Sequence, residues 1–149
     1  MMKASEEIKE MIKRLEGCRL TAYRCPAGVW TIGYGHTGSD VRRGQRISRQ
    51  KAEQLFSADL GRFEDEMQQW MKVDGAPALR QGQYDALLSF AYNVGISALR
   101  RSTLWRKVKA NPDDPTIPEE FGRWVHSNGK VLPGLVARRQ EEAKIYTTI

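Results

Sequence analysis

The chain of 149 residues contains only two cysteines and two histidines, and these small numbers exclude several kinds of site. Two cysteines cannot build the disulfide framework of a small secreted scaffold, and we expect Cys18 and Cys25 to be free thiols in a reducing cytoplasm. With so few Cys and His residues a zinc site is not expected, and neither is any other metal or cofactor.

Long apolar runs are also missing. No stretch of 18 apolar residues occurs, so the sequence predicts no transmembrane helix and no stable membrane insertion. The segment Met1–Glu7 is charged and lacks the apolar core of a secretory signal, so we expect no signal peptide. Repeats, low-complexity tracts and linkers are absent too, and 149 residues fit one domain, which we expect to span residues 1–149.

Basic residues are in excess. The net charge is +6, and the basic residues Arg100, Arg101, Arg106, Lys107 and Lys109 fall within ten positions. Such a surface attracts a polyanion, and nucleic acid, acidic lipid and bacterial cell wall are all polyanions. A solvated basic face that only aids solubility explains the same residues, so charge alone does not choose among these partners.

The first third of the chain predicts one helix followed by extended segments. Ser5 is suited to cap a helix over residues 5–16, and Gly17 is suited to end it. Two segments rich in β-branched and aromatic residues, Leu20–Arg24 and Val29–Tyr34, flank Cys25-Pro26-Ala27-Gly28, which has the Pro and Gly placement of a type I turn. A hairpin or three-stranded sheet is expected here.

The rest of the chain predicts helices separated by turns. The first of these helices runs from Ser48 to about residue 71, and the second begins at Pro77 and ends at Gly95. A short helix runs from Ser102 toward Lys109, and Thr116 caps a further segment that extends through Trp124. A turn at Asn128-Gly129 comes before the last helix, Leu135–Tyr146. The expected fold class is α+β, with a small N-terminal sheet lobe, a larger C-terminal helical lobe, and a cleft between them as the natural ligand site.

Three side chains stand at a distinctive spacing. Glu16 is separated by eight residues from Cys25, which is separated by five from Thr31. A carboxylic acid can protonate a leaving oxygen, and a hydroxyl can donate and accept hydrogen bonds at once and so hold a water. Residues 15–37 resemble the active-site region of the phage lysozymes (endolysins) of glycoside hydrolase family 24, in its Cys form, and the resemblance continues more weakly to the end of the chain.

The resemblance implies a lysozyme-like fold and three catalytic residues. Glu16 is implied as the general acid, which requires burial against apolar neighbours such as Leu15, Leu20 and Trp30 to stay protonated. Thr31 is implied to position the attacking water. For Cys25 two interpretations stay open, a direct chemical role or a small residue at a turn, because a thiol is mostly neutral at pH 7.

Further residues match family positions near the substrate. His36 and Thr37 follow the hairpin, Tyr92 and Asn93 lie in a segment that resembles the far wall of the cleft, and Thr103 lies in a second wall element. A structural role is the alternative for His36, as a support of the loop. For Tyr92 and Asn93 the alternative is a place in a helix core and a cap before Gly95.

The resemblance implies hydrolysis of the β-1,4 bond between N-acetylmuramic acid and N-acetylglucosamine in peptidoglycan, by a phage endolysin that stays in the host cytoplasm until a holin opens the membrane. A monomer is expected, because the sequence has no heptad repeat or other sign of an obligate dimer. One alternative is a noncatalytic module that binds cell wall or nucleic acid, although the sequence lacks the aromatic and Cys/His signatures of RNA-recognition and zinc-finger modules, so no nucleic acid is expected. A lytic transglycosylase, which forms an anhydro-sugar, is the other alternative.

Overall fold

The computed structural model describes residues 2–149, which divide into two compact units. The first, called the sheet unit below, is Lys9–Arg62. The second, called the helical unit, is formed by the residues up to Ile8 together with Phe63–Ile149. The helices α1 (Glu6–Glu16) and α2 (Arg49–Val73) contribute residues to both units.

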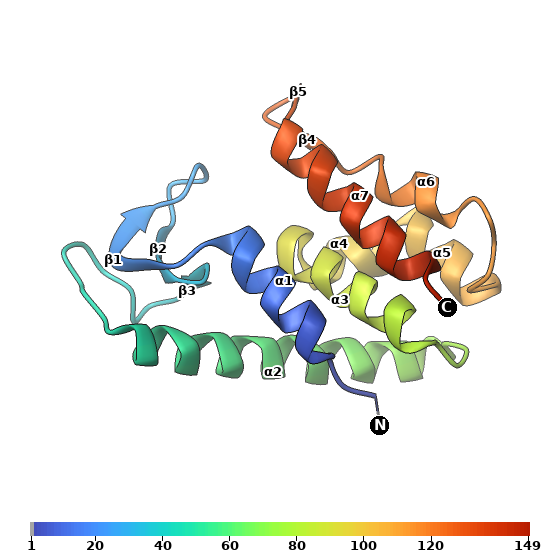
Figure 1. Ribbon diagram of the computed structural model, residues 1–149, viewed down its shortest axis with the longest axis horizontal. Coiled ribbons are helices and arrows are strands. Elements are labelled where there is room, and N and C mark those ends of the chain that lie inside the picture. Colours follow the sequence, from blue (N-terminus) through green and yellow to red (C-terminus); the bar gives the residue numbers. More distant parts are fainter. Residues whose placement is uncertain (1) are drawn as a thin grey trace. The chain divides into compact units, whose positions relative to one another are not determined.

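The sheet unit contains a three-stranded antiparallel sheet in the order β1-β2-β3, drawn in blue to cyan in Figure 1. Its strands are β1 (Arg19–Arg24), β2 (Trp30–Gly33) and β3 (His36–Thr37). Tyr23 pairs with Thr31, and Thr31 pairs with Thr37, so the middle strand carries Thr31 between two neighbours. The predicted hairpin is therefore confirmed.

Local chemistry sets the ends of these elements. The Ser5 hydroxyl accepts the Ile8 N–H at 3.1 Å and so caps α1, and the Gly17 N–H donates to the Lys13 carbonyl at 2.9 Å where the helix ends. The Gly28 N–H donates to the Cys25 carbonyl at 2.7 Å and closes the turn between β1 and β2. These three sequence predictions hold because each depends on residues only a few positions apart.

The core of the sheet unit is made of fully buried aliphatic side chains and one aromatic pair. Ile12, Ile32 and Ala52 have no exposed surface, and Tyr34 packs edge-on against Phe56 with ring centroids 5.7 Å apart. Burial of each large side chain contributes about 1.5–3 kcal/mol relative to exposure. This core fixes α1, β2 and α2 around the residues of the candidate site.

The helical unit contains five further helices and a small hairpin (Figure 1). The helices are α3 (Gln81–Val94), α4 (Ile96–Arg101), α5 (Thr103–Ala110), α6 (Ile117–Phe121) and α7 (Pro133–Thr147). The hairpin joins β4 (His126–Ser127) to β5 (Lys130–Val131) through the predicted turn, where Asn128 and Gly129 both have positive φ.

Helix α3 lies at the centre of this unit. Every residue from Gln83 to Ala91 is buried, and α7 runs along it. A second cluster joins α2 to α5, where Trp70 and Trp105 stack edge-to-face with centroids 4.8 Å apart. Trp105 is thus a core residue.

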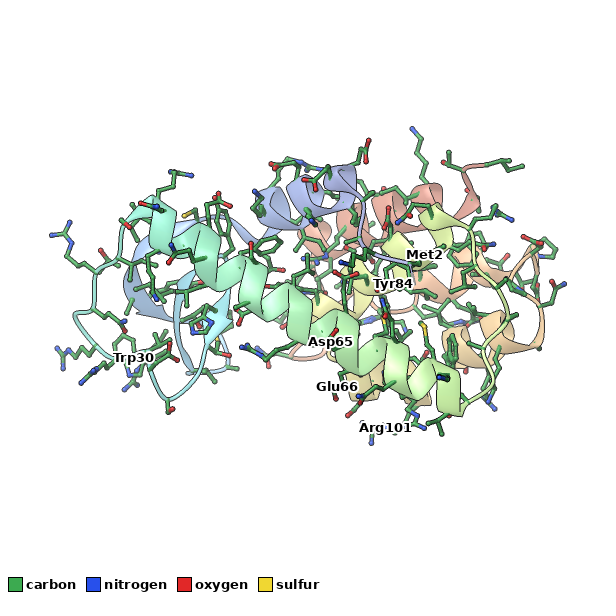
Figure 2. All side chains as sticks on the ribbon, turned by 90° about the horizontal axis from the view of Figure 1, so that it is seen from below. Met2, Trp30, Asp65, Glu66, Tyr84 and Arg101 are labelled. Atoms are coloured by element: carbon green, nitrogen blue, oxygen red, sulfur yellow. The ribbon has the colours of Figure 1, made fainter. Side chains whose placement is uncertain are left out.

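The N-terminal segment is attached to this unit by a polar cluster. The Gln68 amide donates to the Met2 carbonyl at 2.6 Å and to the Tyr84 hydroxyl at 2.9 Å, and Tyr84 in turn donates to Glu64 at 2.8 Å. Figure 2 labels Met2 and Tyr84 beside each other in this cluster.

Three details of the helical prediction are wrong. The third helix begins at Gln81 rather than Pro77, and the Gln83 side chain accepts the Arg80 N–H at 2.8 Å where it begins. Helix α4 was not predicted. Thr116 makes no side-chain cap, and its N–H and hydroxyl both donate to Asp114 instead; α6 ends at Phe121, before the predicted Trp124.

Candidate active site

Glu16 is the last residue of α1 and is half-buried. Its carboxylate lies against the backbone of the β2–β3 turn, since a Cβ added to Gly35 would be 2.8 Å from Glu16 Oε1. Gly35 also has a φ of +80°, which a residue with a side chain rarely adopts. A glycine at this position therefore lets the carboxylate approach the main chain closely.

The apolar enclosure expected around Glu16 is incomplete within the sheet unit. Leu20 is 37% exposed, and Leu15 and Trp30 are only half-buried. Residues 9–62 by themselves thus leave the carboxyl group within reach of solvent and of a ligand.

Cys25 and Thr31 come together at the end of the β1–β2 hairpin. The Cys25 N–H donates to the Val29 carbonyl at 3.0 Å, and the Thr31 hydroxyl donates to the same carbonyl at 2.9 Å. Thr31 is buried, while Cys25 is half-buried. The hairpin register brings a thiol and a hydroxyl that are six positions apart to one place.

Hydrogen-bond donors around Cys25 favour its thiolate. The backbone of Val29 lowers the pKa of the Cys25 thiol most, the backbone of Ala27 and the side chain of Thr31 lower it further, and partial burial opposes them. Donors aimed at sulfur stabilise the anion more than the neutral thiol. The Cys25 sulfur is accordingly a better anion than an unperturbed thiol at the same pH.

Tyr23 is a neighbour of this group that the sequence did not indicate. Burial raises the pKa of the Tyr23 hydroxyl, and the charges of Glu16 and Cys25 raise it further, while Arg19 lowers it. Tyr23 lies on β1 directly opposite Thr31 of β2. The sheet unit thus contains Glu16, Tyr23, Cys25 and Thr31.

His36 is held between two carboxylates. Its Nδ1 lies 2.8 Å from Asp59 and its Nε2 lies 2.9 Å from Asp40, so both ring nitrogens are occupied. Burial lowers the pKa of His36, but the bonds to Asp59 and Asp40 outweigh it and raise the pKa overall. Asp59 also pairs with Arg62. This placement agrees with a supporting role for His36 rather than a sugar contact.

Thr37 lies on β3 next to His36 and is exposed, with its backbone paired to Thr31. Its hydroxyl is thus accessible beside the strand that carries Thr31. Asp40 and Asp59, which orient His36, are four and 23 residues away from it, and no local pattern in the sequence signals the longer of these links.

The other predicted substrate residues belong to the helical unit. Tyr92 is half-buried, with its ring 4.9 Å from that of Phe63, and Thr103 is exposed and accepts a hydrogen bond from Arg106 at 3.0 Å. Asn93 is exposed, accepts a hydrogen bond from Arg139, and lines a pocket of about 410 Å³. The remaining pocket residues are Val94, Arg123, Trp124, His126, Ser127, Leu132 and Leu135.

A buried polar network stands behind Asn93. Glu142 pairs with Arg139 at 2.9 Å and with Arg138 at 3.2 Å, and it accepts a hydrogen bond from the Ser89 hydroxyl at 2.6 Å. Burial raises the pKa of Glu142, although both arginines act to lower it. The network fixes the guanidinium group that contacts Asn93.

Within residues 2–149, no group of three or more His, Cys, Asp and Glu side chains is arranged to hold a metal ion. In the same part of the chain, no helix combines the length and apolar character needed to cross a membrane.

Comparison with known proteins assigns the chain to a family. The model of the phage lysozyme family matches residues 13–142, which include Glu16, Cys25 and Thr31. The chain belongs to the phage lysozyme family. The predicted family is thus confirmed, whereas the roles of the individual site residues stay predictions.

Individual relatives share this match over the whole chain. The endolysin of Bacillus phage B103 is 43% identical over 149 residues, covering 99% of this chain and 55% of the relative. The endolysin of Acyrthosiphon pisum secondary endosymbiont phage 1 is 39% identical, covering 97% of this chain and 98% of the relative. The chain thus spans about half the length of the first relative and nearly all of the second.

A solved structure confirms the lysozyme-like fold. The muramidase domain of SpmX from Asticaccaulis excentricus superposes with a TM-score of 0.84 at 33% identity, and the match covers 100% of both chains. The α+β class expected from the sequence is also what the helices and the three-stranded sheet show.

Proposed function

We propose that this protein is a muramidase that hydrolyses the β-1,4 bond between N-acetylmuramic acid and N-acetylglucosamine in peptidoglycan. The observation that carries the proposal is that one compact unit of a phage lysozyme family member holds Glu16 against the β2–β3 turn and Cys25 and Thr31 together at the β1–β2 hairpin. Related proteins are named endolysins and a muramidase domain, which supports the same substrate class.

In the proposed reaction, Glu16 protonates the leaving group and Thr31 binds the attacking water. The Glu16 carboxylic acid gives its proton to the glycosidic oxygen as the bond to the anomeric carbon breaks. A water bound by the Thr31 hydroxyl forms the new bond to that carbon from the opposite side. The proton that the water loses passes to the Cys25 thiolate when that group is ionised, or otherwise to solvent. Product stereochemistry is then inverted.

The biological setting is part of the proposal. Several relatives are phage endolysins, so the protein is proposed to degrade the host wall at the end of a phage cycle. It is proposed to act as a monomer, without nucleic acid, and to reach the wall from the host cytoplasm after a holin opens the membrane.

The test is Glu16→Gln, which keeps the shape of the side chain and removes its transferable proton. We expect wall-lysing activity to fall about 10²–10⁴-fold with the fold intact, as loss of a general acid does. Clearing of purified peptidoglycan is measured by turbidity, and folding by circular dichroism. Glu10→Gln is the matched control, because Glu10 lies on the same helix and its side chain is 71% exposed.

Mass spectrometry of the products distinguishes the alternatives. A hydrolase leaves a reducing muramic acid, whereas a lytic transglycosylase leaves an anhydro-sugar lighter by one water. A noncatalytic binding module leaves the glycan uncut. Normal clearing by well-folded Glu16→Gln, or an anhydro product, would contradict the proposal.

A further inference from the structure

The net positive charge of the protein comes entirely from one of its two units. The sheet unit, residues 9–62, contains eleven Lys and Arg and five Asp and Glu, a net charge of +6. The remaining residues contain thirteen of each, a net charge of zero. The whole excess of the chain therefore lies on the unit that carries Glu16, Cys25 and Thr31.

Backbone pairing brings five of the eight exposed arginines of the sheet unit to one edge. The loop after β3 runs beside β1, because the Ala22 N–H donates to Gln45 and the Ile47 N–H donates to Leu20, both at 2.9 Å. Thr21 pairs with Arg46 in this arrangement. The loop arginines thus lie next to the strand arginines; the five, called the arginine edge below, are Arg19, Arg24, Arg42, Arg43 and Arg46.

The guanidinium groups of the arginine edge are available to a ligand. All five residues are exposed, and none of them forms an ion pair with any residue in the described part of the chain. Arg19 stacks over the Tyr23 ring at 4.6 Å and Arg24 over the Trp30 ring at 5.0 Å. Figure 2 shows nitrogen-tipped side chains near the labelled Trp30. Stacking orders an arginine without using its N–H donors.

Acidic residues do not neutralise this edge. Between residues 17 and 52 the only acid is Asp40, which is bound to His36. The basic residues of the helical unit differ, since Arg100 pairs with Asp74 at 2.8 Å and Lys107 pairs with Glu120 at 2.8 Å. Two of the five basic residues at positions 100–109, Arg100 and Lys107, are therefore paired with acids in the fold.

We propose that the arginine edge binds a phosphodiester polymer of the bacterial cell wall and holds the enzyme against its substrate. Guanidinium groups bind phosphate in a bidentate manner. A row of positively charged side chains is also complementary to a polymer that carries one negative charge in each repeat. The peptides of peptidoglycan carry amino and carboxyl groups together, so they match such an array less well. The inference rests on the proposed function for its biological meaning.

The test measures binding without cleavage, in a Glu16→Gln background. The loop triple combines Arg42→Gln, Arg43→Gln and Arg46→Gln. The control triple combines Lys72→Gln, Arg101→Gln and Lys144→Gln, which are exposed residues of the helical unit and remove the same charge; Figure 2 labels Arg101. The probes are purified Gram-positive walls before and after removal of their phosphodiester polymers.

At low salt we expect the loop triple to bind intact walls about tenfold more weakly than the parent, whereas the control triple changes little. The difference should shrink at high salt, because exposed charges are screened, and it should vanish on stripped walls. Activity of the loop triple with Glu16 restored should be unchanged on a soluble uncharged oligosaccharide.

Four outcomes would overturn the inference. The first two are an equal loss of wall affinity in both triples and an unchanged wall affinity in the loop triple. The third is a loss of affinity in the loop triple that is as large on stripped walls as on intact walls. The fourth is tighter binding of the parent to duplex DNA or anionic vesicles than to intact walls. Failure of the proposed function is seen separately, as clearing of walls by the Glu16→Gln background.

Discussion

At the residue scale, Gly35 connects backbone conformation to catalysis. Its φ of +80° and its closeness to Glu16 Oε1 mean that a methyl group there strains the turn and displaces the carboxylate. We expect Gly35→Ala to lose about 1–2 kcal/mol of unfolding free energy. Because small misplacements of a catalytic group are costly, we also expect about a 10²-fold loss of activity.

Gly44 offers a matched control for this prediction. It has a φ of +79°, but a Cβ added there would meet nothing within 4 Å. Gly44→Ala should show the stability loss without the loss of activity, measured by urea denaturation and by turbidity. Equal activities of the two variants would show that the approach of Gly35 to Glu16 is unimportant.

Cys25 gives a second prediction at this scale. The donors that lower its pKa favour an anion, so an ionised carboxylate at the same place should serve as well. We expect Cys25→Asp to equal or exceed the parent in kcat, and Cys25→Ala to keep partial activity. Steady-state rates on peptidoglycan fragments measure both.

Retained configuration at the anomeric carbon would change this interpretation. It would indicate a covalent sugar adduct on Cys25, and Cys25→Ala would then abolish turnover. Full activity of both Cys25→Ala and Cys25→Ser would instead indicate a small residue at a turn.

At the element scale, the His36–Asp59 pair joins β3 to α2. The His36 and Asp59 side chains are only 8% and 7% exposed, so loss of the Asp59 charge leaves a buried imidazolium with one partner fewer. We expect Asp59→Asn to lower the free energy of unfolding by about 2–3 kcal/mol at pH 5.5. Urea denaturation at several pH values measures the loss.

The sign of the pH dependence follows from the raised pKa of His36. The folded protein binds this proton more tightly than the unfolded chain, so the stabilisation is complete below the unfolded pKa of about 6.5 and is lost as pH rises through the higher folded pKa. The effect of Asp59→Asn should therefore be smaller at pH 9. Asp40→Asn is the control, and because the Asp40 side chain is 61% exposed, its loss should stay below about 1 kcal/mol. A pH-independent effect of Asp59→Asn would rule out the ion pair as its cause.

At the scale of the whole molecule, the distribution of charge differs from what the sequence suggests. Five basic residues cluster at positions 100–109 in the sequence, but Asp74 and Glu120 pair with two of them. We expect the salt dependence of wall binding to arise mainly from the sheet unit, and comparison of the loop and control triples measures this. These ion pairs could not be predicted from the sequence, because the acids lie 26 positions from Arg100 and 13 positions from Lys107.

The sequence by itself determined the local features of this protein. The caps at Ser5, Ser48 and Ser102 and the turn at Cys25–Gly28 were predictable, because each is a hydrogen bond between groups a few residues apart. The α+β class followed from the periodicity, and the family followed from the resemblance of residues 15–37 to the phage lysozymes; the comparisons confirm both.

Only the tertiary structure decided which distant groups meet. In the fold, Asp59 bonds to His36, which is 23 residues away in the sequence, and Arg139 bonds to Asn93, which is 46 residues away. The loop arginines lie beside β1 for the same reason. Such contacts depend on the packing of several elements at once, and their partners are not fixed by any spacing along the chain.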